Sequence, residues 1–364
     1  MRFRQPGYQA LLRLLVAIVV PPAMHGCAVA VNEPAARPFD ESVFGADSVG
    51  VYVRVVDVGA ALCVIAATRD RRYFVYDAGG ADQACLKAIR EIVSDGNIDL
   101  LVVSHSDGNH MQDVPALLDE FAVGEIWWTG YRRPQLSFRQ TARAIDAAQQ
   151  AGTVVRNLRS GAVEPGTAVS LGDATITFVA GWRSWPTTDG LDEAELHKVV
   201  SIVTRLDYGG SSLLLAGDTI GRSTSGPDDE CDFAEARMVD NQAAVSLAAD
   251  VLVAPNHGAN NASSRCLIAA VQPTYVIFPA GHGKGNPEAG AAARYLDAGI
   301  PAARILRTDR GDDEGEREWD YRRASGCRDQ PGDDDVEILM PKQGSPLVRY
   351  LRPDDVCVVM KSAL

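Results

Sequence analysis

Residues 98–110 read IDLLVVSHSDGNH, and this stretch decides the fold. Its first six residues are mostly apolar, which predicts a buried strand. The strand runs directly into a polar loop that carries His105, Asp107, Asn109 and His110. Catalytic groups gather at strand ends because loops converge there while the sheet stays rigid. Imidazole and carboxylate groups suit zinc, so the stretch predicts a metal site at the end of a buried strand.

The other histidines repeat this placement. The chain has six histidines, of which His25 lies close to the N-terminus. His197 and His257 lie beside two further predicted strands, and His282 lies in a Gly-rich loop after a third. A single histidine is more often structural than a ligand. Several of them at strand ends, with Asp218 at the end of another strand, favour one shared metal centre.

Outward from this stretch, short apolar strands alternate with helical periodicity. Strands are predicted at 51–58, 61–67, 73–76, 98–103, 174–179, 200–206, 212–215, 251–254, 274–278 and 304–307. Helices are predicted at 83–93, 114–121, 137–150, 233–248, 262–270 and 287–298. The order gives two strand-plus-helix halves. It predicts an α/β fold in which two sheets pack together with helices outside them, since each sheet face must be buried.

The N-terminus has the features of an export signal. Arg2, Arg4 and Arg13 supply positive charge, residues 11–20 are mostly apolar, and residues 28–30 read AVA, an A-x-A cleavage site. The apolar run is short for a membrane span. We therefore expect a protein that is exported to the periplasm or secreted, with no stable membrane span after cleavage.

The domain limits follow from this interpretation. Residues 1–30 are predicted to be the signal peptide, 31–48 a linker and 49–364 one hydrolase-like domain. Within that domain, 309–335 is a polar insertion and 336–364 a closing tail of one or two strands. An uncleaved N-terminal anchor is an alternative. Lipidation at Cys27 is another, although the residues before it fit a lipobox poorly.

The composition and net charge of the chain indicate which kinds of partner it can bind. Hydrophobic residues make up 46% and charged residues 23% of the chain, as in ordinary globular proteins. Residues 1–30 hold three arginines and no acidic residue, so their removal takes the net charge from −13 to −16. Surfaces that bind polyanions normally have the opposite balance. This argues against non-specific nucleic-acid binding, although a cationic metal centre can still receive a phosphate locally.

Six cysteines remain after cleavage, and none forms a C-x-x-C pair, which excludes a zinc ribbon. In an oxidising compartment some of them can pair. Cys63 lies in an apolar strand and is predicted to be a buried free thiol. Cys327 in the polar insertion and Cys357 in the tail after it are the predicted disulfide.

Five short motifs together resemble the metallo-β-lactamase superfamily. Residues 105–110 (HSDGNH) resemble its H-x-[HD]-x-D-H signature, and residues 77–80 (DAGG) resemble the D-x-G-G turn before it. Residues 197–201 (HKVVS), 214–218 (LLAGD) and 255–258 (PNHG) are similar to the later ligand motifs. Order and spacing fit over residues 50–308. The resemblance implies a four-layer αββα sandwich.

Within that superfamily, the chain most resembles the soluble hydrolase domain of ComEC-type DNA-uptake proteins. The similar motifs are VDVG at 56–59, SHSD at 104–107, SIV at 201–203 and ADVLVAPNHGA at 249–259. No ten-helix channel region accompanies them. This resemblance implies a free-standing, exported phosphodiesterase or nuclease-like hydrolase that uses a metal-activated water on a small-molecule or phosphodiester substrate, with nucleic acid bound at the active site only.

The resemblance also implies the roles of the site residues. One metal site uses His105, Asp107 and His197, the other uses Asn109, His110 and His257, and Asp218 bridges them. The implied cofactor is one or two Zn²⁺ ions, with Mn²⁺ as an alternative. The residues assigned to catalysis are Asp218, His257, Asn109 and His282. Those assigned to substrate binding are Asn256, Lys284 and Asn286.

Three asparagines depart from the superfamily pattern. Asn109 stands where the family has Asp, and Asn256 and Asn286 stand where it has His. An amide oxygen is neutral and a weaker zinc ligand than a carboxylate, so the second metal site is expected to be weakened at Asn109. The three asparagines motivate one alternative, a degenerate binding protein of this fold with weak or no catalysis. A β-lactamase-like amide or ester hydrolase is a separate alternative, because a fold of this kind hosts many reactions.

Overall fold

The structure is a computed structural model of the 364-residue chain. It describes residues 41–45, 49–80, 82–161, 163–185, 191–224, 226–281, 284–310, 317–320, 332 and 334–352. The chain divides into residues 1–36 and 37–364, and every described residue lies in the second unit. The predicted signal peptide and Cys27 fall outside the described residues.

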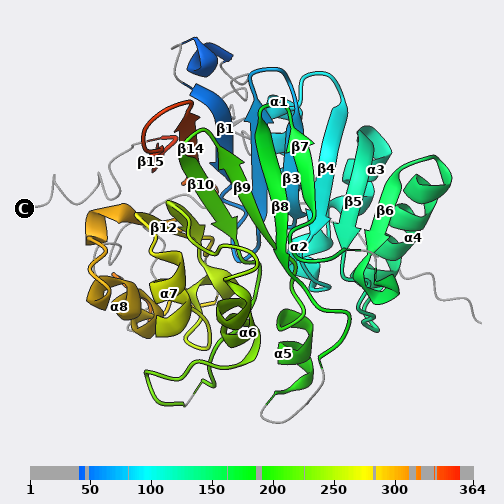
Figure 1. Cartoon of the computed structure of the whole chain (residues 1–364). Helices are drawn as coiled ribbons and strands as arrows, with labels where there is room; N and C mark the ends of the chain where they lie inside the picture. Colours follow the sequence, from blue (N-terminus) through cyan, green and yellow to red (C-terminus); the bar gives the residue numbers. More distant parts are fainter. Residues whose placement is uncertain are drawn as a thin grey trace, which may run out of the picture. The chain divides into compact units, whose positions relative to one another are not determined.

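The first sheet has eight described strands (Figure 1). In spatial order they are β15 (Leu347–Tyr350), β14 (Val336–Pro341), β1 (Val49–Val55), β2 (Cys63–Thr68), β3 (Tyr73–Ala78), β4 (Asn97–Val103), β5 (Ala122–Trp128) and β6 (Val154–Asn157). The pairs from β15 to β3 are antiparallel, and those from β3 to β6 are parallel. The C-terminal tail thus supplies β14 and β15, and β14 pairs with β1 at the start of the domain.

The second sheet has seven described strands. In spatial order they are β13 (Ile305–Arg307), β12 (Tyr275–Phe278), β11 (Val251–Val253), β10 (Ser211–Leu215), β9 (Val203–Tyr208), β8 (Ala174–Ala180) and β7 (Ala168–Leu171). The strands β10 to β13 are parallel, and β7 to β10 are antiparallel. The parallel parts of both sheets bring several strand ends to one edge, where loops can converge.

Helices cover the outer face of each sheet. The helices are α1 (Ala84–Ile92), α2 (Gly108–Met111), α3 (Val114–Glu120), α4 (Leu136–Gln150), α5 (Glu193–Lys198), α6 (Phe233–Asn241), α7 (Arg265–Val271) and α8 (Ala289–Asp297). Four 3-10 turns accompany them: η1 (Glu41–Phe44), η2 (Leu158–Ser160), η3 (Pro255–Gly258) and η4 (Ala302–Arg304). Helices α1, α3 and α4 pack on the first sheet, and α6, α7 and α8 pack on the second.

Three apolar layers hold these elements together. Along β1, Val51 and Val53 face the second sheet, whereas Tyr52 between them faces the helices, because successive side chains of a strand alternate. The inter-sheet layer joins such residues to Leu213 and Val251 of the second sheet. The predicted four-layer αββα sandwich is therefore confirmed.

Some predicted boundaries are wrong. The helix predicted at 233–248 ends at Asn241, and a turn follows in which the Asn241 carbonyl accepts the N–H groups of Ala244 and Val245. The strand predicted at 200–206 begins only at Val203, and the residues before it form α5 and a turn. Such ends are decided by local hydrogen bonds that apolar periodicity does not reveal.

The prediction that Cys63 is a free thiol is also wrong. Cys63 forms a disulfide with Cys85, and a second disulfide joins Cys231 to Cys266. Cys63 is fully buried, as predicted, but α1 lays Cys85 against β2. The predicted partners Cys327 and Cys357 lie outside the described residues.

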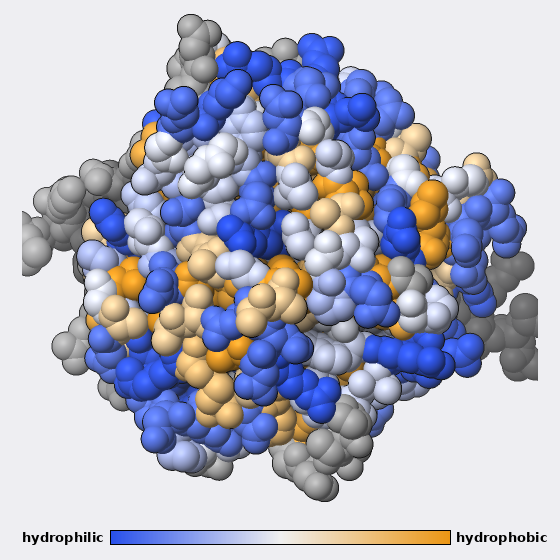
Figure 2. Space-filling view, in the orientation of Figure 1, coloured by the Kyte–Doolittle hydropathy of each residue, from blue (hydrophilic) through white to orange (hydrophobic). Residues whose placement is uncertain are grey.

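On the face drawn in Figure 2, hydrophilic residues predominate and hydrophobic ones form small groups, the largest over the region of β12, α6 and α7.

Among the described helices, none combines the length and apolar character that crossing a membrane requires.

Candidate metal centre

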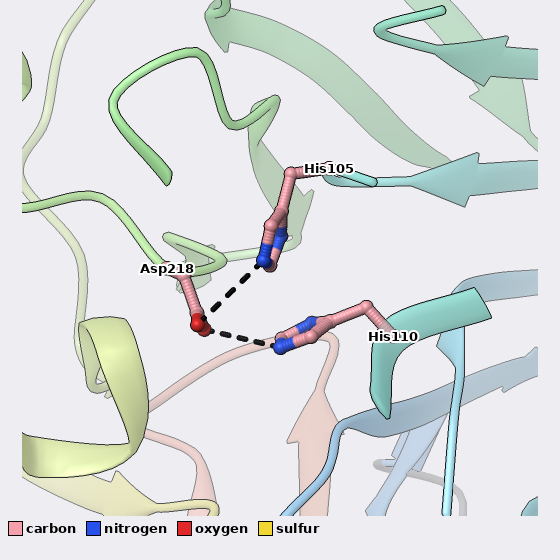
Figure 3. A group of neighbouring side chains, drawn as sticks. All are labelled: His105, His110 and Asp218. Carbon is pink, nitrogen blue, oxygen red and sulfur yellow. Dashed lines mark ion pairs between the residues drawn. The ribbon is translucent and has the colours of Figure 1, made fainter. Parts of the chain in front are cut away.

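The candidate centre lies where several strands end. His105 follows β4, and His110 is on the short helix α2 that begins three residues later. Asp218 follows β10, and His257 lies in the turn η3 after β11. Figure 3 shows His105, His110 and Asp218 pointing toward one another from these separate elements. The predicted convergence of these three residues is thus present in the fold.

The three side chains form a tight buried cluster. One ligand-type atom from each lies within 4.8 Å of the other two. Asp218 Oδ1 is 3.2 Å from His110 Nε2, and Asp218 Oδ2 is 3.6 Å from His105 Nε2. The two imidazole rings are 4.1 Å apart between centroids. Asp218 therefore directs one oxygen toward each histidine.

His257 joins the cluster through a constrained turn. Asn256 and His257 both adopt left-handed backbone angles, with φ of 49° and 56°. The His257 Nδ1 atom lies 2.6 Å from the carbonyl oxygen of Pro279, to which it donates. This leaves Nε2 facing the centre, 3.2 Å from His110 Nε2 and 3.4 Å from Asp218 Oδ1. Residues in such sparsely populated conformations concentrate at functional sites.

Asp77 positions the loop that carries the histidines. Its carboxylate accepts hydrogen bonds from the Ser104 N–H at 2.6 Å and the Ser104 hydroxyl at 2.7 Å, and lies 2.8 Å from His110 Nδ1. This contact fixes which ring nitrogen of His110 faces the centre. Asp77 was absent from the predicted site residues, although its D-x-G-G turn was the available signal. Within that turn, a Cβ on Gly79 would lie 1.7 Å from the Asn109 carbonyl oxygen, so only glycine fits.

Two cations that sequence reasoning missed lie beside the carboxylates. The Lys198 ammonium is 3.0 Å from Asp218 Oδ2, and the Arg133 guanidinium contacts Asp107 Oδ1. The other oxygen of Asp107 is 3.4 Å from His105 Nε2. No motif singled out Arg133; the only hint for Lys198 was its place directly after His197.

The centre thus has two sides that share Asp218. We define the His110 side as His110, His257 and Asn109, around Asp218 Oδ1. We define the His105 side as His105 and Asp107 with the cations Lys198 and Arg133, around Asp218 Oδ2, and we add to it His197, the third ligand that the resemblance implies for this side.

His197 and Asn109 are the predicted ligands with the least direct geometry. His197 is buried on α5, packs edge-on against Tyr131 with ring centroids 4.8 Å apart, and lies outside the tight cluster. The Asn109 amide nitrogen lies 3.2 Å from both the Ala60 carbonyl oxygen and His257 Nε2. The Asn109 group that faces His257 is therefore the NH₂, which cannot ligate a metal ion.

Burial and neighbouring charges give the four histidines different pKa values. Burial and the neighbouring His110 lower the pKa of His105 to about 3. Burial and the charge of Arg133 lower the pKa of His197 to about 4, and burial likewise lowers that of His257 to about 4 against the pull of Asp218. Burial also opposes charge on His110, yet Asp218 and Asp77 raise its pKa to about 9. Neutral imidazole is the form that binds metals.

Asp218 remains ionised although it is buried. Burial alone would raise its pKa, but Lys198 and the histidines hold it well below the ordinary value. A charged carboxylate beside the neutral imidazoles of His105 and His257 is a suitable hard ligand for a divalent cation.

A cavity of about 470 Å³ opens onto the centre. Its lining includes Asp107, Asn109, Lys198 and His257 together with the predicted substrate-binding residues Asn256, Lys284 and Asn286. The structure therefore brings these three residues to the same pocket. The predicted catalytic residue His282 lies outside the described residues.

The donor set fits a metal ion. Within the described part of the chain, His105 Nε2, both ring nitrogens of His197 and Asp218 Oδ1 are buried without a hydrogen-bond partner, and Asp218 Oδ2 has only its ion pair with Lys198. Buried polar atoms are normally paired, so a cluster of such atoms needs an explanation. A cation that His105, His110, His257 and Asp218 could hold supplies one.

Comparisons with known proteins give likenesses of structure only. No family model matches the chain, and no curated protein matches it. Similar solved structures include the metallo-β-lactamase fold protein YhfI from Bacillus subtilis, with 13% identity, a TM-score of 0.42, and coverage of 71% of this chain and 96% of that chain. A novel metallo hydrolase from the hyperthermophilic archaeon Ignicoccus hospitalis has 13% identity, a TM-score of 0.41, and coverage of 79% and 98%.

A variant of the CmlA β-hydroxylase has 16% identity and a TM-score of 0.41, with coverage of 71% of this chain and 52% of that chain. At these scores, the conclusion of a metal centre rests on the side-chain geometry described above.

Proposed function

We propose that this protein is an exported metal-dependent hydrolase of the metallo-β-lactamase type, with zinc as its metal and a phosphodiester as its substrate class. The observation that carries the proposal is the convergence of His105, His110, His257 and Asp218, with unpartnered buried atoms, beside a pocket that His257 lines. The phosphodiester assignment depends on the short sequence motifs that resemble those of ComEC-type proteins. The two disulfides support export, since disulfides persist in oxidising compartments.

When bound, the metal ion supplies Lewis-acid activation of water and of the scissile group. The chain itself supplies orientation and charge. Asp77 and the Pro279 carbonyl fix the ring nitrogens that His110 and His257 present to the centre. Lys198 and Lys284 add positive charge at the pocket, where an anionic phosphodiester binds.

Metal content and hydrolysis of bis(4-nitrophenyl) phosphate test the proposal on the purified protein. We expect bound zinc, hydrolysis that a chelator abolishes, and recovery when Zn²⁺ or Mn²⁺ is added. Asp218→Asn is expected to lose hydrolysis by more than about 100-fold, because the ligand shared by both sides is removed. Asp146→Asn, an exposed carboxylate on α4, is the matched control and is expected to leave the rate unchanged.

A protein without bound metal that stays inactive after Zn²⁺ and Mn²⁺ are added would contradict the proposal. Hydrolysis of a β-lactam or a carboxylic ester, with none of the phosphodiester, would keep the metal centre and replace the substrate class.

A second candidate function is ligand binding with weak or no catalysis. The orientation of Asn109 favours it, because an amide NH₂ stands toward His257 where the related motif has a carboxylate. Metal-dependent binding of a phosphodiester without turnover would identify this function.

A further inference from the structure

The position of Lys198 restricts how many ions the centre can hold. Its ammonium lies 3.0 Å from Asp218 Oδ2 and 2.5 Å from the Asn256 side-chain oxygen. The Lys198 side chain is 21% exposed, and that of Asp218 is 2% exposed. Lysine has three N–H donors and no acceptor. It therefore pairs with the one Asp218 oxygen that an ion on the His105 side would need.

A chain of side-chain hydrogen bonds holds this ammonium in place. Lys198 donates to the Asn256 oxygen, and the Asn256 amide donates to the Asn261 oxygen at 2.7 Å. The Asn261 amide in turn donates to Glu195 at 3.2 Å. Glu195 lies on α5, three residues before Lys198, so the chain closes on the helix from which it starts. Each amide offers its oxygen to one neighbour and its nitrogen to the next, which leaves one consistent orientation.

The helix α5 is itself anchored. Asp192 caps its N-terminus, and Glu195 reciprocates by accepting the Asp192 N–H, which together make a capping box. Glu195 thus both fixes the start of the helix and ends the hydrogen-bond chain. Lys198 is therefore held at its backbone by the capped helix and at its ammonium by the hydrogen bond to Asn256.

The second carboxylate of the His105 side is paired as well. Asp107 Oδ1 contacts the Arg133 guanidinium, whose side chain is 14% exposed. On the His110 side, the three facing atoms are His110 Nε2, His257 Nε2 and Asp218 Oδ1. In the part of the chain that is described, no ammonium or guanidinium pairs with that oxygen, and the cation that faces it is His110 itself. A histidine gives up its proton when it binds a metal ion, whereas Lys198 and Arg133 keep their charge, so the two sides differ in fixed positive charge.

We propose that Lys198, supported by Arg133, supplies the positive charge that a second metal ion would supply, so that the centre binds one divalent ion on the His110 side. The inference rests on the proposed function only in taking the cluster to bind metal. A divalent ion on the His105 side would stand close to the ammonium in a pocket of low dielectric, where repulsion between like charges is strong. Asn256, in place of the family's histidine, is the acceptor that keeps the ammonium there.

Titration of the metal-free, full-length protein with Co²⁺, followed by visible absorption and by metal analysis, measures the number of ions per chain. We expect one ion per chain for the natural protein. We expect Lys198→Met to bind a second ion at least tenfold more tightly than the natural protein does, because Asp218 Oδ2 becomes free. Lys284→Met, which removes the same charge from the same pocket, is the matched control and should keep one ion.

The possible outcomes separate the two proposals. Two ions in the natural protein would overturn the single-ion inference and leave the metal-dependent function standing. One ion in both the natural protein and Lys198→Met would also overturn the inference. No ion in the natural protein would overturn both proposals. Should Lys198→Met fail to fold by circular dichroism, Lys198→Gln removes the charge with a polar side chain and takes its place.

Discussion

The two sides of the candidate centre contain similar residue types and differ in what surrounds them. The His105 side has His105, Asp107 and His197, which by the resemblance is the complete set of ligands. The structure places a lysine and an arginine against its two carboxylate contacts. The His110 side has lost a carboxylate at Asn109, yet its two imidazoles face one oxygen of Asp218, and no lysine or arginine is described beside that oxygen.

This difference shows that a ligand motif and a metal site are separate properties. A carboxylate binds a metal ion only if its charge is available, and a buried carboxylate that is paired with a lysine is already neutralised. By the number of ligand-type residues, the His105 side ranks first. By available negative charge, the His110 side ranks first, because a lysine and an arginine pair with the carboxylates of the His105 side. Four predictions test the ranking.

The largest effect is expected at Asp218, which both sides share. Asp218→Asn should weaken Co²⁺ binding by more than about 100-fold, since loss of an outer partner alone costs about 10–100-fold. Isothermal titration with Co²⁺ measures this. Binding within tenfold of the natural protein would show that the ion lies elsewhere and would remove the basis for comparing the two sides.

Asp77 should have the next largest effect, because it contacts His110 directly and reaches His105 only through the Ser104 hydroxyl. Asp77→Asn should weaken Co²⁺ binding by about 10–100-fold, as for other carboxylates that hold a metal-binding histidine. Asp99→Asn is the matched control. Asp99 also accepts a backbone N–H, that of Tyr73 at 2.8 Å, but at the opposite end of β4. Equal losses in both variants would mean that Asp77 acts through stability alone.

Asn109→Asp should strengthen the His110 side. It places a carboxylate where the amide NH₂ now faces His257, and we expect Co²⁺ to bind about tenfold more tightly, which corresponds to about 1.4 kcal/mol. Asn286→Asp adds the same charge to the pocket and should have a smaller effect. If both variants bind alike, the gain is a general effect of charge and Asn109 is not beside the ion.

The smallest effect is expected at Asp107. Because Arg133 already pairs with it, Asp107→Asn should change Co²⁺ affinity by less than about fivefold, or roughly 1 kcal/mol. The same titration measures it. A loss as large as that of Asp218→Asn would show that Asp107 is a ligand and would reverse the ranking of the two sides.

The fold was the part that local sequence could predict well. Apolar alternation along segments such as 51–55 predicts a strand, and the structure shows this strand buried on both faces. The αββα layers that the resemblance implies are confirmed. Boundaries were less accessible, as the early end of α6 at Asn241 shows, because hydrogen bonds of single turns decide them. The disulfide partner of Cys63 was missed because α1 brings Cys85 against β2 only in the folded chain.

By itself, the sequence determined which residue types stand at strand ends, and therefore His105, His110, Asp218 and His257 as candidate ligands. Strand periodicity is a local property, so it can be read from neighbours in the chain. Only the tertiary structure decided which charges meet these ligands. Lys198 pairs directly with Asp218 and is held there by a chain of hydrogen bonds that closes on its own helix, and Arg133 reaches Asp107 from a distant loop. Charge acts across space, and its balance at the centre exists only once the elements are packed.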